Sequence, residues 1–552
     1  MDMNEQEPEF TRQSKFLMVG KQRHSVATIA LYVIFVTVAA VGWEYWDSRD
    51  EALIKEVISQ SPNLVMLSAN DMEGLGKITD WFRVLVIAGK SKSAFATARG
   101  IKDAYSRSFA MVSIAETLTV TGKTDEAQQV ADEAFKSAGR IKDAFPRAQA
   151  MVSVVKAMVK LGKTNEAQRA VNEALELTKR IEGPYAMAGI VEALGKAGKP
   201  DEAQQVASEA LRQARLFPEA EARSRMMSNI VEALAKAGKT EEAQIVANEA
   251  LGTASWIAQL DYRAKAISCV VDALTKMGKT DEALETAFRI VDVDNRHKAA
   301  VIVTRAQSMV SVLDVLAKAG KKDDVLRVAG LALEIARAIE DANSRIGVTR
   351  DIAEALAEVG AADEAQQVAE EALETGRRIE YAYTRSQAMA GIVESLSKIG
   401  MINEAIKTTR GIYDEDNRAR ALGCIVDALA KGGKTDEALE TARKIEDTNH
   451  RAQAMVVVAD VMAINREMEK ARAVLDEAQS SALQSKGPEK SARLATIAMA
   501  FARIRNYRMA CETADLCVSS SDKLTAYTGI FREYLIMRNP ELEMLLAEKK
   551  QK

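Results

Sequence analysis

Carboxylate side chains recur in this sequence with a spacing that suits a periodic binding surface. Each stands near the middle of an apolar segment, and most successive members are 40 residues apart. Such a side chain must face solvent or a partner, because burying an unpaired carboxylate is prohibitively costly. A row of ionised carboxylates could bind basic groups of another molecule. The recurring acids are Glu116, Glu192, Glu232, Asp272, Asp314, Glu354, Glu394 and Asp427.

A lysine stands four residues after most of these carboxylates, as in Glu192 with Lys196 and Asp427 with Lys431. This order of charges is the favourable one within a helix. Two interpretations therefore remain open. The acids form either a solvated, locally neutralised face or a surface that binds a basic or helical peptide. Lys156 takes the place of the acid in one segment.

Arginine recurs at a second fixed place, near the expected starts of helices, where its charge opposes the helix dipole. An aspartate often precedes it by four residues, as Asp103 and Asp341 do. Guanidinium groups suit fixed turns, so we expect a structural ladder of inter-repeat ion pairs and hydrogen bonds rather than a ligand site. Its members are Arg107, Arg147, Arg223, Arg263, Arg305, Arg345, Arg385, Arg418 and Arg451.

The sequence contains no motif for catalysis, metal binding or a cofactor. His24, His297 and His450 are dispersed, and the 4 cysteines are too scattered for a disulfide framework or a zinc site. The repeated Gly-Lys-Thr follows a helical segment and lacks the upstream glycine of a phosphate-binding loop. We therefore predict no enzymatic activity, no cofactor, no bound metal and no small-molecule substrate.

The elements that position these residues follow from an internal repeat. Phrases such as TGKTDEAQQVADEAF, AGKTEEAQIVANEAL and GGKTDEALETARKI recur along the chain, with weaker echoes near Asn465 and Asn506. Most spacings are 33 or 40 residues, a difference close to two helical turns, so a lengthened second helix keeps its packing face. The repeats share a glycine: Gly89, Gly122, Gly162, Gly198, Gly238, Gly278, Gly320, Gly360, Gly400 and Gly433.

Each repeat predicts a helical hairpin. An apolar-periodic first helix ends at the glycine, which can adopt the left-handed cap. Thr124 or its equivalent then caps a second helix, and Asp125 and Glu126 complement the dipole of its first turn. A methionine row eleven residues before the glycine, including Met111 and Met151, is typical of core filling. Composition agrees with an all-α fold, since aromatic residues make up only 5%.

This pattern resembles the tetratricopeptide repeat over about residues 75 to 535, although that family's tryptophan, tyrosine and closing proline are absent. The resemblance implies that first helices line a concave groove and that the recurring acids lie in it, facing a protein or peptide partner. The small alanine of the family is matched by Ala127, Ala167, Ala203, Ala243, Ala283, Ala365, Ala405 and Ala438.

The array also resembles the pentatricopeptide class, which reads RNA one base per repeat. That code needs polar residues at one fixed place, but Val112, Val152, Ala390 and Gly423 stand ten residues before their glycines. The formal net charge of -4 provides no basic field for a nucleic-acid backbone. We therefore predict no nucleic-acid partner, and an RNA-binding array is the disfavoured alternative.

Residues 26–46 predict a transmembrane helix. Val26 to Trp43 carry no charge and are just long enough to span a bilayer core, and Tyr45 and Trp46 extend an aromatic belt. Basic residues dominate before this segment, so the positive-inside rule predicts a cytoplasmic N-terminus and an extracytoplasmic array, as in a bacterial periplasm. A cleaved secretory signal is the rival interpretation, which the long polar stretch before the apolar run disfavours.

The expected fold is an all-α solenoid of about eleven stacked helix-turn-helix repeats, preceded by one transmembrane helix. Stacked hairpins should form a curved rod tethered to a bilayer. The predicted function is a membrane-anchored protein–protein interaction scaffold or adaptor, with an accessory structural subunit of a larger membrane complex as the alternative. The expected segments are 1–25 (cytoplasmic tail), 26–46 (transmembrane helix), 47–75 (linker and first helix), 76–535 (solenoid) and 536–552 (C-terminal tail).

Overall fold

The computed structural model describes residues 50–68, 72–162, 164–178, 188, 190–192, 194, 200–216, 219–257, 260–290, 298–487 and 489–547. The chain divides into two compact units, residues 1–59 and 60–552. In the first unit the described residues, 50–59, are helical. The second unit holds the array of helices. Every regular element in the described ranges is a helix, so the predicted all-α solenoid is confirmed.

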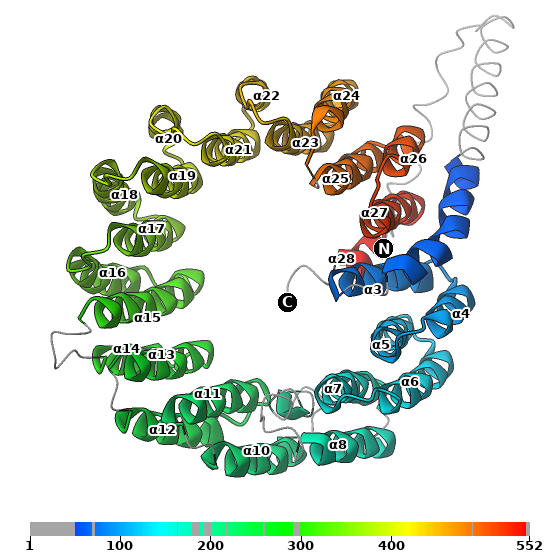
Figure 1. The fold of residues 1–552 in the computed structure, drawn as a ribbon, viewed down its shortest axis with the longest axis horizontal. Coiled ribbons are helices and arrows are strands. Elements are labelled where there is room, and N and C mark those ends of the chain that lie inside the picture. Colours follow the sequence, from blue (N-terminus) through cyan, green and yellow to red (C-terminus); the bar gives the residue numbers. More distant parts are fainter. Residues whose placement is uncertain are drawn as a thin grey trace, which may run out of the picture. The chain divides into compact units, whose positions relative to one another are not determined.

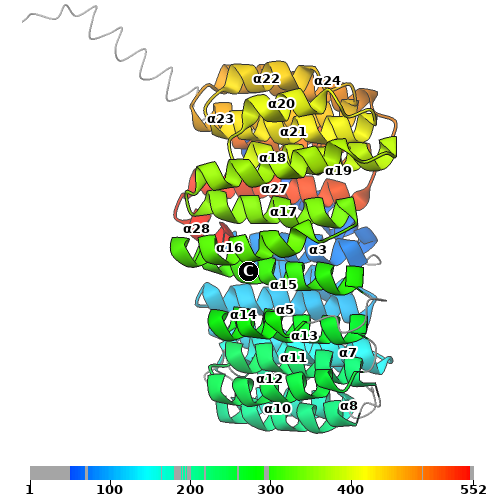
Figure 2. The same cartoon turned by 90° about the vertical axis from the view of Figure 1, so that its left-hand side faces the viewer.

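The first helices of successive hairpins form the inner layer of the second unit (Figure 1). They are α3 (Met72–Ile87), α5 (Ala104–Val120), α7 (Ala144–Lys160), α11 (Ala220–Lys236), α13 (Leu260–Lys276), α15 (Lys298–Lys318), α17 (Ala342–Glu358), α19 (Ala382–Lys398), α21 (Glu415–Lys431), α23 (Thr448–Ile464), α25 (Glu489–Arg503) and α27 (Ser520–Arg538). Inner helices of neighbouring hairpins pack against one another, and their axes run nearly parallel (Figure 2).

The second helices form the outer layer. They are α4 (Ser91–Gly100), α6 (Thr124–Gly139), α8 (Thr164–Thr178), α10 (Pro200–Arg215), α12 (Thr240–Ser255), α14 (Thr280–Phe288), α16 (Lys322–Arg337), α18 (Ala362–Arg377), α20 (Ile402–Thr409), α22 (Thr435–Arg443), α24 (Met468–Gln484) and α26 (Tyr507–Asp515). Repeats of 40 residues have 16-residue outer helices such as α6 and α12, whereas α20 and α22, in repeats of 33, have 8 and 9 residues. The outer helix therefore absorbs the difference in repeat length. A short helix, α28 (Leu542–Ala547), follows α27 within the segment predicted as a tail.

A residue in the left-handed region ends the inner helices, as predicted. Gly122 has φ 77°, and the next residue, Lys123, donates its N–H to the Leu118 carbonyl at 2.9 Å. Two arginines, Arg466 (φ 65°) and Arg505 (φ 60°), take this role where glycine is missing. The repeat therefore continues through the segments where its sequence signal is weak.

The predicted threonine cap of the second helix is wrong. In α6 the N-cap is Lys123, its side chain makes no capping hydrogen bond, and Thr124 is the first helical residue. Asp125 and Glu126 do lie in the first turn, where they complement the helix dipole. The Gly-Lys turn already orients the chain into the helix, so a hydroxyl cap is not required.

The core between the layers consists of small and aliphatic side chains. The methionine row is buried, with Met111 and Met151 at 0% exposure, which confirms its role as core filler. The recurring alanines of the outer helices, such as Ala127 and Ala243, are also buried at 0%. Alanine at this place allows the two helices of a hairpin to approach closely.

The array closes on itself because α3 packs against α27. The ring of Trp81 in α3 lies 5.8 Å from that of Phe531 in α27, and Trp81 is fully buried. Lys77 Nζ lies 3.3 Å from Asp522 Oδ1 across the same contact. The prediction of a rod with free ends is therefore corrected: the terminal hairpins cover each other's apolar sides.

The predicted single-pass topology, with the N-terminus cytoplasmic and the solenoid extracytoplasmic, is contradicted. Within the described ranges, no helix has both the length and the apolar character needed to cross a bilayer. Residues 26–46, the predicted anchor, lie outside the described residues. Periodicity predicted the array, whereas the topology depended on composition alone.

Removal of the closing contact should destabilise the protein. Trp81→Ala is expected to lower the free energy of unfolding by about 3–5 kcal/mol, because it opens a cavity beside Phe531. Trp81→Phe should cost less than half of that, since it keeps an aromatic contact and removes an indole N–H that has no acceptor among the described residues. Denaturant titration followed by far-ultraviolet circular dichroism measures both.

The matched control is Trp256→Ala, since Trp256 is 84% exposed and its loss should change stability by less than about 0.5 kcal/mol. Equal effects of the two tryptophan-to-alanine changes would contradict the closing contact.

Candidate partner-binding surface

The predicted carboxylates lie in one row on the inner layer. They occupy equivalent places on α5, α11, α13, α15, α17, α19 and α21, and Glu192 is in the described stretch 190–192 before α10. All are partly accessible, and Asp314 is exposed. Lys156 stands at the same place on α7. The sequence therefore identified residues that the fold aligns on one surface.

Lysines of neighbouring hairpins bind many of these carboxylates. Glu116 Oε1 lies 2.9 Å from Lys160 Nζ of the next hairpin, and Glu354 lies 3.1 Å from Lys398 in the same way. Each of these lysines stands two residues before its glycine. We call these inter-hairpin pairs the acid–lysine ladder. Its other members are Glu192–Lys236 (3.6 Å), Glu232–Lys276 (2.7 Å) and, with arginine as the cation, Asp460–Arg503 (2.9 Å).

Glu232 shows how the ladder works electrostatically. Its carboxylate lies between Lys276 of the next hairpin at 2.7 Å and Lys236 of its own helix at 2.9 Å. Partial burial raises the pKa of Glu232, but hydrogen bonds from Lys276 and Lys236 outweigh burial and hold the pKa below its ordinary value. The ionised form is thus the one that the fold stabilises.

The ladder supports the neutralised-face interpretation of the acids without removing their accessibility. Paired side chains such as Glu354 (29% exposed) and Lys398 (53% exposed) remain in contact with solvent. Exposed ion pairs of this type contribute roughly 0–1 kcal/mol each, so a partner could exchange them at little cost. The binding role of the row stays a prediction.

The ladder is not continuous. Two residues before Gly360 stands Glu358 instead of lysine, and Asp314 pairs with Lys318 of its own helix at 2.6 Å. Glu394 and Asp427 likewise pair within their own helices, with Lys398 at 3.1 Å and Lys431 at 2.7 Å. The lysine spacing in the sequence predicted these intrahelical pairs, whereas the inter-hairpin pairs needed the register of the fold.

The arginine row lies in the turns between hairpins and is structural. Arg107 Nη1 donates to the Ile101 carbonyl at 2.6 Å, which gives an acceptor to the cation and a donor to an orphan carbonyl at the end of α4. Arg263, Arg385, Arg418 and Arg451 donate in the same way to the carbonyls of Ile257, Ile379, Ile412 and Ile445. The expected hydrogen-bonded ladder is therefore present at these positions.

The remaining arginines of the row differ in their partners. Arg147 pairs with Glu173 of the outer helix, and the Arg305 guanidinium lies 5.2 Å from the ring centre of Phe288. Burial lowers the pKa of Arg305. The Nε atoms of Arg223 and Arg345 have no acceptor among the described residues.

The aspartates before these arginines are helix caps rather than ion-pair partners. The carboxylates of Asp103, Asp341 and Asp414 accept hydrogen bonds from backbone N–H groups three residues on, at 2.6, 2.7 and 2.9 Å. Asp143 is also an N-cap, without a side-chain bond. The expected ion pairing is corrected here, because the first turn of a helix offers unpaired N–H groups that a carboxylate satisfies better.

A buried isoleucine in each of these turns was missed at first. Ile101, Ile339 and Ile445 are each 1% exposed and fill the junction between an outer helix and the next inner helix. The signal was available, since isoleucine recurs twenty-one residues before the glycine. It was overlooked because the turns read as polar.

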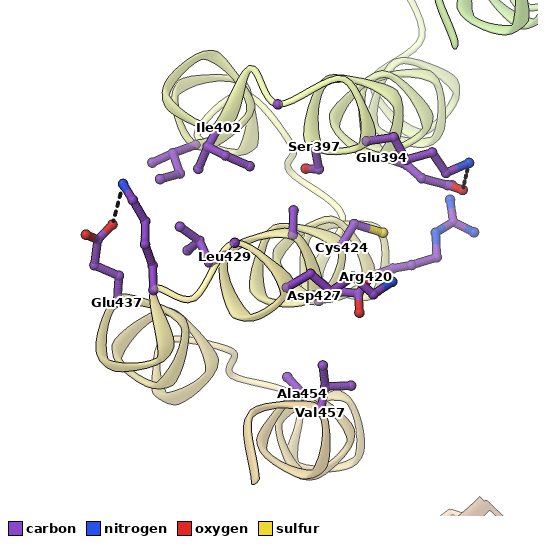
Figure 3. A pocket seen from close by; sticks show the side chains of 18 of the residues that line it. Glu394, Ser397, Ile402, Arg420, Cys424, Asp427, Leu429, Glu437, Ala454 and Val457 are labelled. Atoms are coloured by element: carbon purple, nitrogen blue, oxygen red, sulfur yellow. Dashed lines mark hydrogen bonds and ion pairs between the residues drawn. The ribbon is translucent and has the colours of Figure 1, made fainter. Parts of the chain in front are cut away.

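A cleft opens on α19, α20, α21, α22 and α23, where the ladder is interrupted (Figure 3). Its volume is about 1070 Å³. Arg420 and Asp427 of α21 line it together with Glu394 of α19, and Ile402 of α20 forms part of an apolar wall. Sequence analysis had no means of finding this cleft, which depends on how two short hairpins pack.

Candidate groups for catalysis or metal binding are sparse where the structure can be examined. Within the described ranges no group of three or more metal-ligating side chains comes together. His450 pairs with Asp447 at 2.7 Å, whereas His24 and His297 lie outside the described residues. Cys511 and Cys517 are buried, and burial raises the pKa of Cys517 to about 12.

No family model matches the sequence, and no curated protein matches it. Among solved structures, Ton1535 from Thermococcus onnurineus NA1 is similar at 18% identity over 62% of this chain and 99% of that chain, with a TM-score of 0.27. The human IFIT1 dimer with PPP-AAAA gives 13%, 77%, 98% and 0.26, and a circular tandem repeat protein gives 13%, 91%, 100% and 0.16. Similarity at these scores carries no argument about the role of this chain.

The ladder should make stability depend on pH. Glu232→Gln is expected to lower the free energy of unfolding by about 0.5–1 kcal/mol at pH 7. Because the folded-state pKa of Glu232 is depressed, the contribution is present above the ordinary glutamate pKa of about 4.3 and is lost as pH falls through the folded value. Urea titrations at pH 7 and at about pH 3.5 measure the difference between variant and parent.

Glu285→Gln on outer helix α14 is the control, since Glu285 is 72% exposed and outside the ladder. A cost of Glu232→Gln that does not shrink at low pH would refute the role given to its lysine partners.

Proposed function

We propose that this chain is a protein-interaction scaffold that binds partner proteins on the surface of its inner layer. The observation that carries the proposal is the continuity of that layer, in which first helices of successive hairpins pack side by side and present partly accessible charged residues in register. Such a surface can contact a partner over many hairpins at once. In this proposal the chain has no catalytic role, cofactor or small-molecule substrate.

The ladder supports this function in a specific way. Its acids are held in fixed positions by lysines, so they are preorganised for a basic partner. The lysines are mostly exposed, for example Lys276 at 56%, and can turn away when a partner's arginine or lysine replaces them. A basic or helical segment is therefore the partner chemistry expected for the middle of the array.

A structural subunit of a larger complex is the second candidate, favoured by one observation. Large apolar side chains are exposed in the turns between hairpins: Trp256 at 84%, Tyr381 at 79% and Tyr413 at 72%. Exposed aromatic side chains often mark surfaces that another protein covers. In this case the turns, rather than the inner layer, would carry the interface.

Charge reversal on the inner layer distinguishes these functions. The triple change Glu232→Lys, Asp272→Lys and Asp314→Lys should reduce recovery of specific partners at least tenfold, because it replaces the acidic row with like charge for a basic partner. Quantitative mass spectrometry of proteins retained by the full chain from nuclease-treated lysate of its source cells measures this. Helicity should be unchanged.

The matched control is Glu285→Lys, Glu334→Lys and Glu370→Lys, which makes the same charge change on exposed sites of outer helices α14, α16 and α18. Partners lost from the inner variant but kept by the outer variant support the proposal. Equal retention by both variants would overturn it, and loss caused by nuclease alone would point to a nucleic-acid partner instead.

A further inference from the structure

The cleft at α19–α23 differs from the rest of the inner layer in its electrostatic balance. The carboxylates that line it are Glu394, Asp427 and Glu437, and each pairs with a lysine three or four residues away on its own hairpin. Arg420, which also lines the cleft, has no carboxylate partner among the described residues. The pairs are Glu394–Lys398 (3.1 Å), Asp427–Lys431 (2.7 Å) and Glu437–Lys434 (3.6 Å).

Arg420 is held in place but retains hydrogen-bonding capacity. Its Nη2 donates to Asn417 Oδ1 at 3.2 Å, and Asn417 is itself fixed by Asp414. A guanidinium has five N–H donors, so the remaining ones can meet a carboxylate in the two-point geometry that arginine favours. The side chain projects from α21 toward the Glu394–Lys398 pair (Figure 3).

The cleft also has an apolar part. Ile402 and Ile406 of α20, Leu429 of α21 and Val457 of α23 line it, and all but the buried Leu429 are partly accessible. Between these walls the cleft is kept open by small residues. Gly423 is one of them, and a Cβ built there would meet no atom within 4 Å.

Packing explains why the opening occurs here. At the other junctions of the ladder an acid of one hairpin binds a lysine of the next, which draws the inner helices together. In this part of the described chain Glu394 and Asp427 keep their lysines within their own helices. The position that would supply a cation to Asp427 is occupied by Ile464, which is 79% exposed.

We propose that this cleft binds an acidic–apolar peptide segment of a partner protein, with a carboxylate side chain on Arg420 and a neighbouring leucine-like side chain against Ile402 and Ile406. The inference rests on the proposed scaffold function and names a second contact, distinct from the acidic row. Charge complementarity decides the occupant. A basic segment would face Arg420 and three lysines whose carboxylates are already engaged.

Fluorescence anisotropy with labelled hexapeptides tests the proposal on the full chain. One peptide alternates leucine and glutamate, a second has glutamine for glutamate, and a third has lysine for glutamate. The glutamate peptide should bind at least tenfold tighter than the lysine peptide. Arg420→Gln should lower the affinity for the glutamate peptide about tenfold, to that of the glutamine peptide.

A cleft-filling variant and its control separate binding from folding. Gly423→Leu should abolish binding of the glutamate peptide while helicity is kept, because the added side chain enters open space. Gly347→Leu makes the same change on α17, outside the cleft, where a Cβ also meets nothing within 4 Å, and should leave binding intact.

Two cysteines at equivalent places provide an independent readout. Cys424 lines the cleft, and Cys269 occupies the same repeat position on α13, outside it. Burial raises the pKa of the Cys424 thiol, so alkylation is followed at about pH 9. The glutamate peptide should slow alkylation of Cys424 at least fivefold and leave the rate at Cys269 unchanged.

Equal affinity for the glutamate and lysine peptides, no saturable binding of the glutamate peptide up to millimolar concentration, or no effect of Arg420→Gln would each overturn the proposal. These outcomes are independent of the inner-layer charge reversal. The scaffold function can therefore survive failure of the cleft, and its own failure is seen in the retention experiment.

Discussion

Helical hairpins of this type bury only part of their apolar surface, and stacking hides the remainder at every junction except the two ends. The contact between α3 and α27 removes these ends, because Trp81 is buried against Phe531 while Lys77 meets Asp522. Described contacts run from α10 through to α27, cross to α3 and continue to α8. Closure therefore replaces the polar capping repeats that an open solenoid requires.

Closure also restricts the inner layer. In an open solenoid each junction can flex independently, whereas in a closed array a change at one junction must be compensated at others. The acid–lysine ladder sets the approach of the inner helices at several junctions, and the α19–α23 region lacks it. The cleft is thus a consequence of where lysine and acid fall in the repeat, and it places Arg420 beside an opening that its neighbours do not have.

Periodicity carried most of what the sequence could predict. The glycine register, the buried methionines and alanines, and the alignment of the acids on one surface follow from local rules that repeat in every hairpin. Continuation of the repeat at Arg466 and Arg505 was visible only as weak echoes, since arginine rarely takes positive φ. Closure depends on one pair of residues, Trp81 and Phe531, from opposite ends of the array, and no repeat pattern connects them.

Local chemistry accounts for the remaining errors. Aspartates before the arginine row were expected to form ion pairs, but helix starts at Asp103 and Asp341 use them as caps. The inter-hairpin partners of the acids were missed because lysines within the same helix already satisfied the pattern. The binding surface was therefore predicted as a row of residues, while its interruption, and with it Arg420, required three-dimensional structure.

The most direct test of the closed array is zero-length carbodiimide cross-linking of the full chain, with isotope-labelled and unlabelled chains mixed to separate contacts within one chain from contacts between chains. The account predicts an isopeptide between Lys77 and Asp522 within single chains, formed alongside the ladder pair Lys276–Glu232 and lost in Asp522→Asn. Formation of the Lys276–Glu232 link without any intrachain Lys77–Asp522 link would contradict closure.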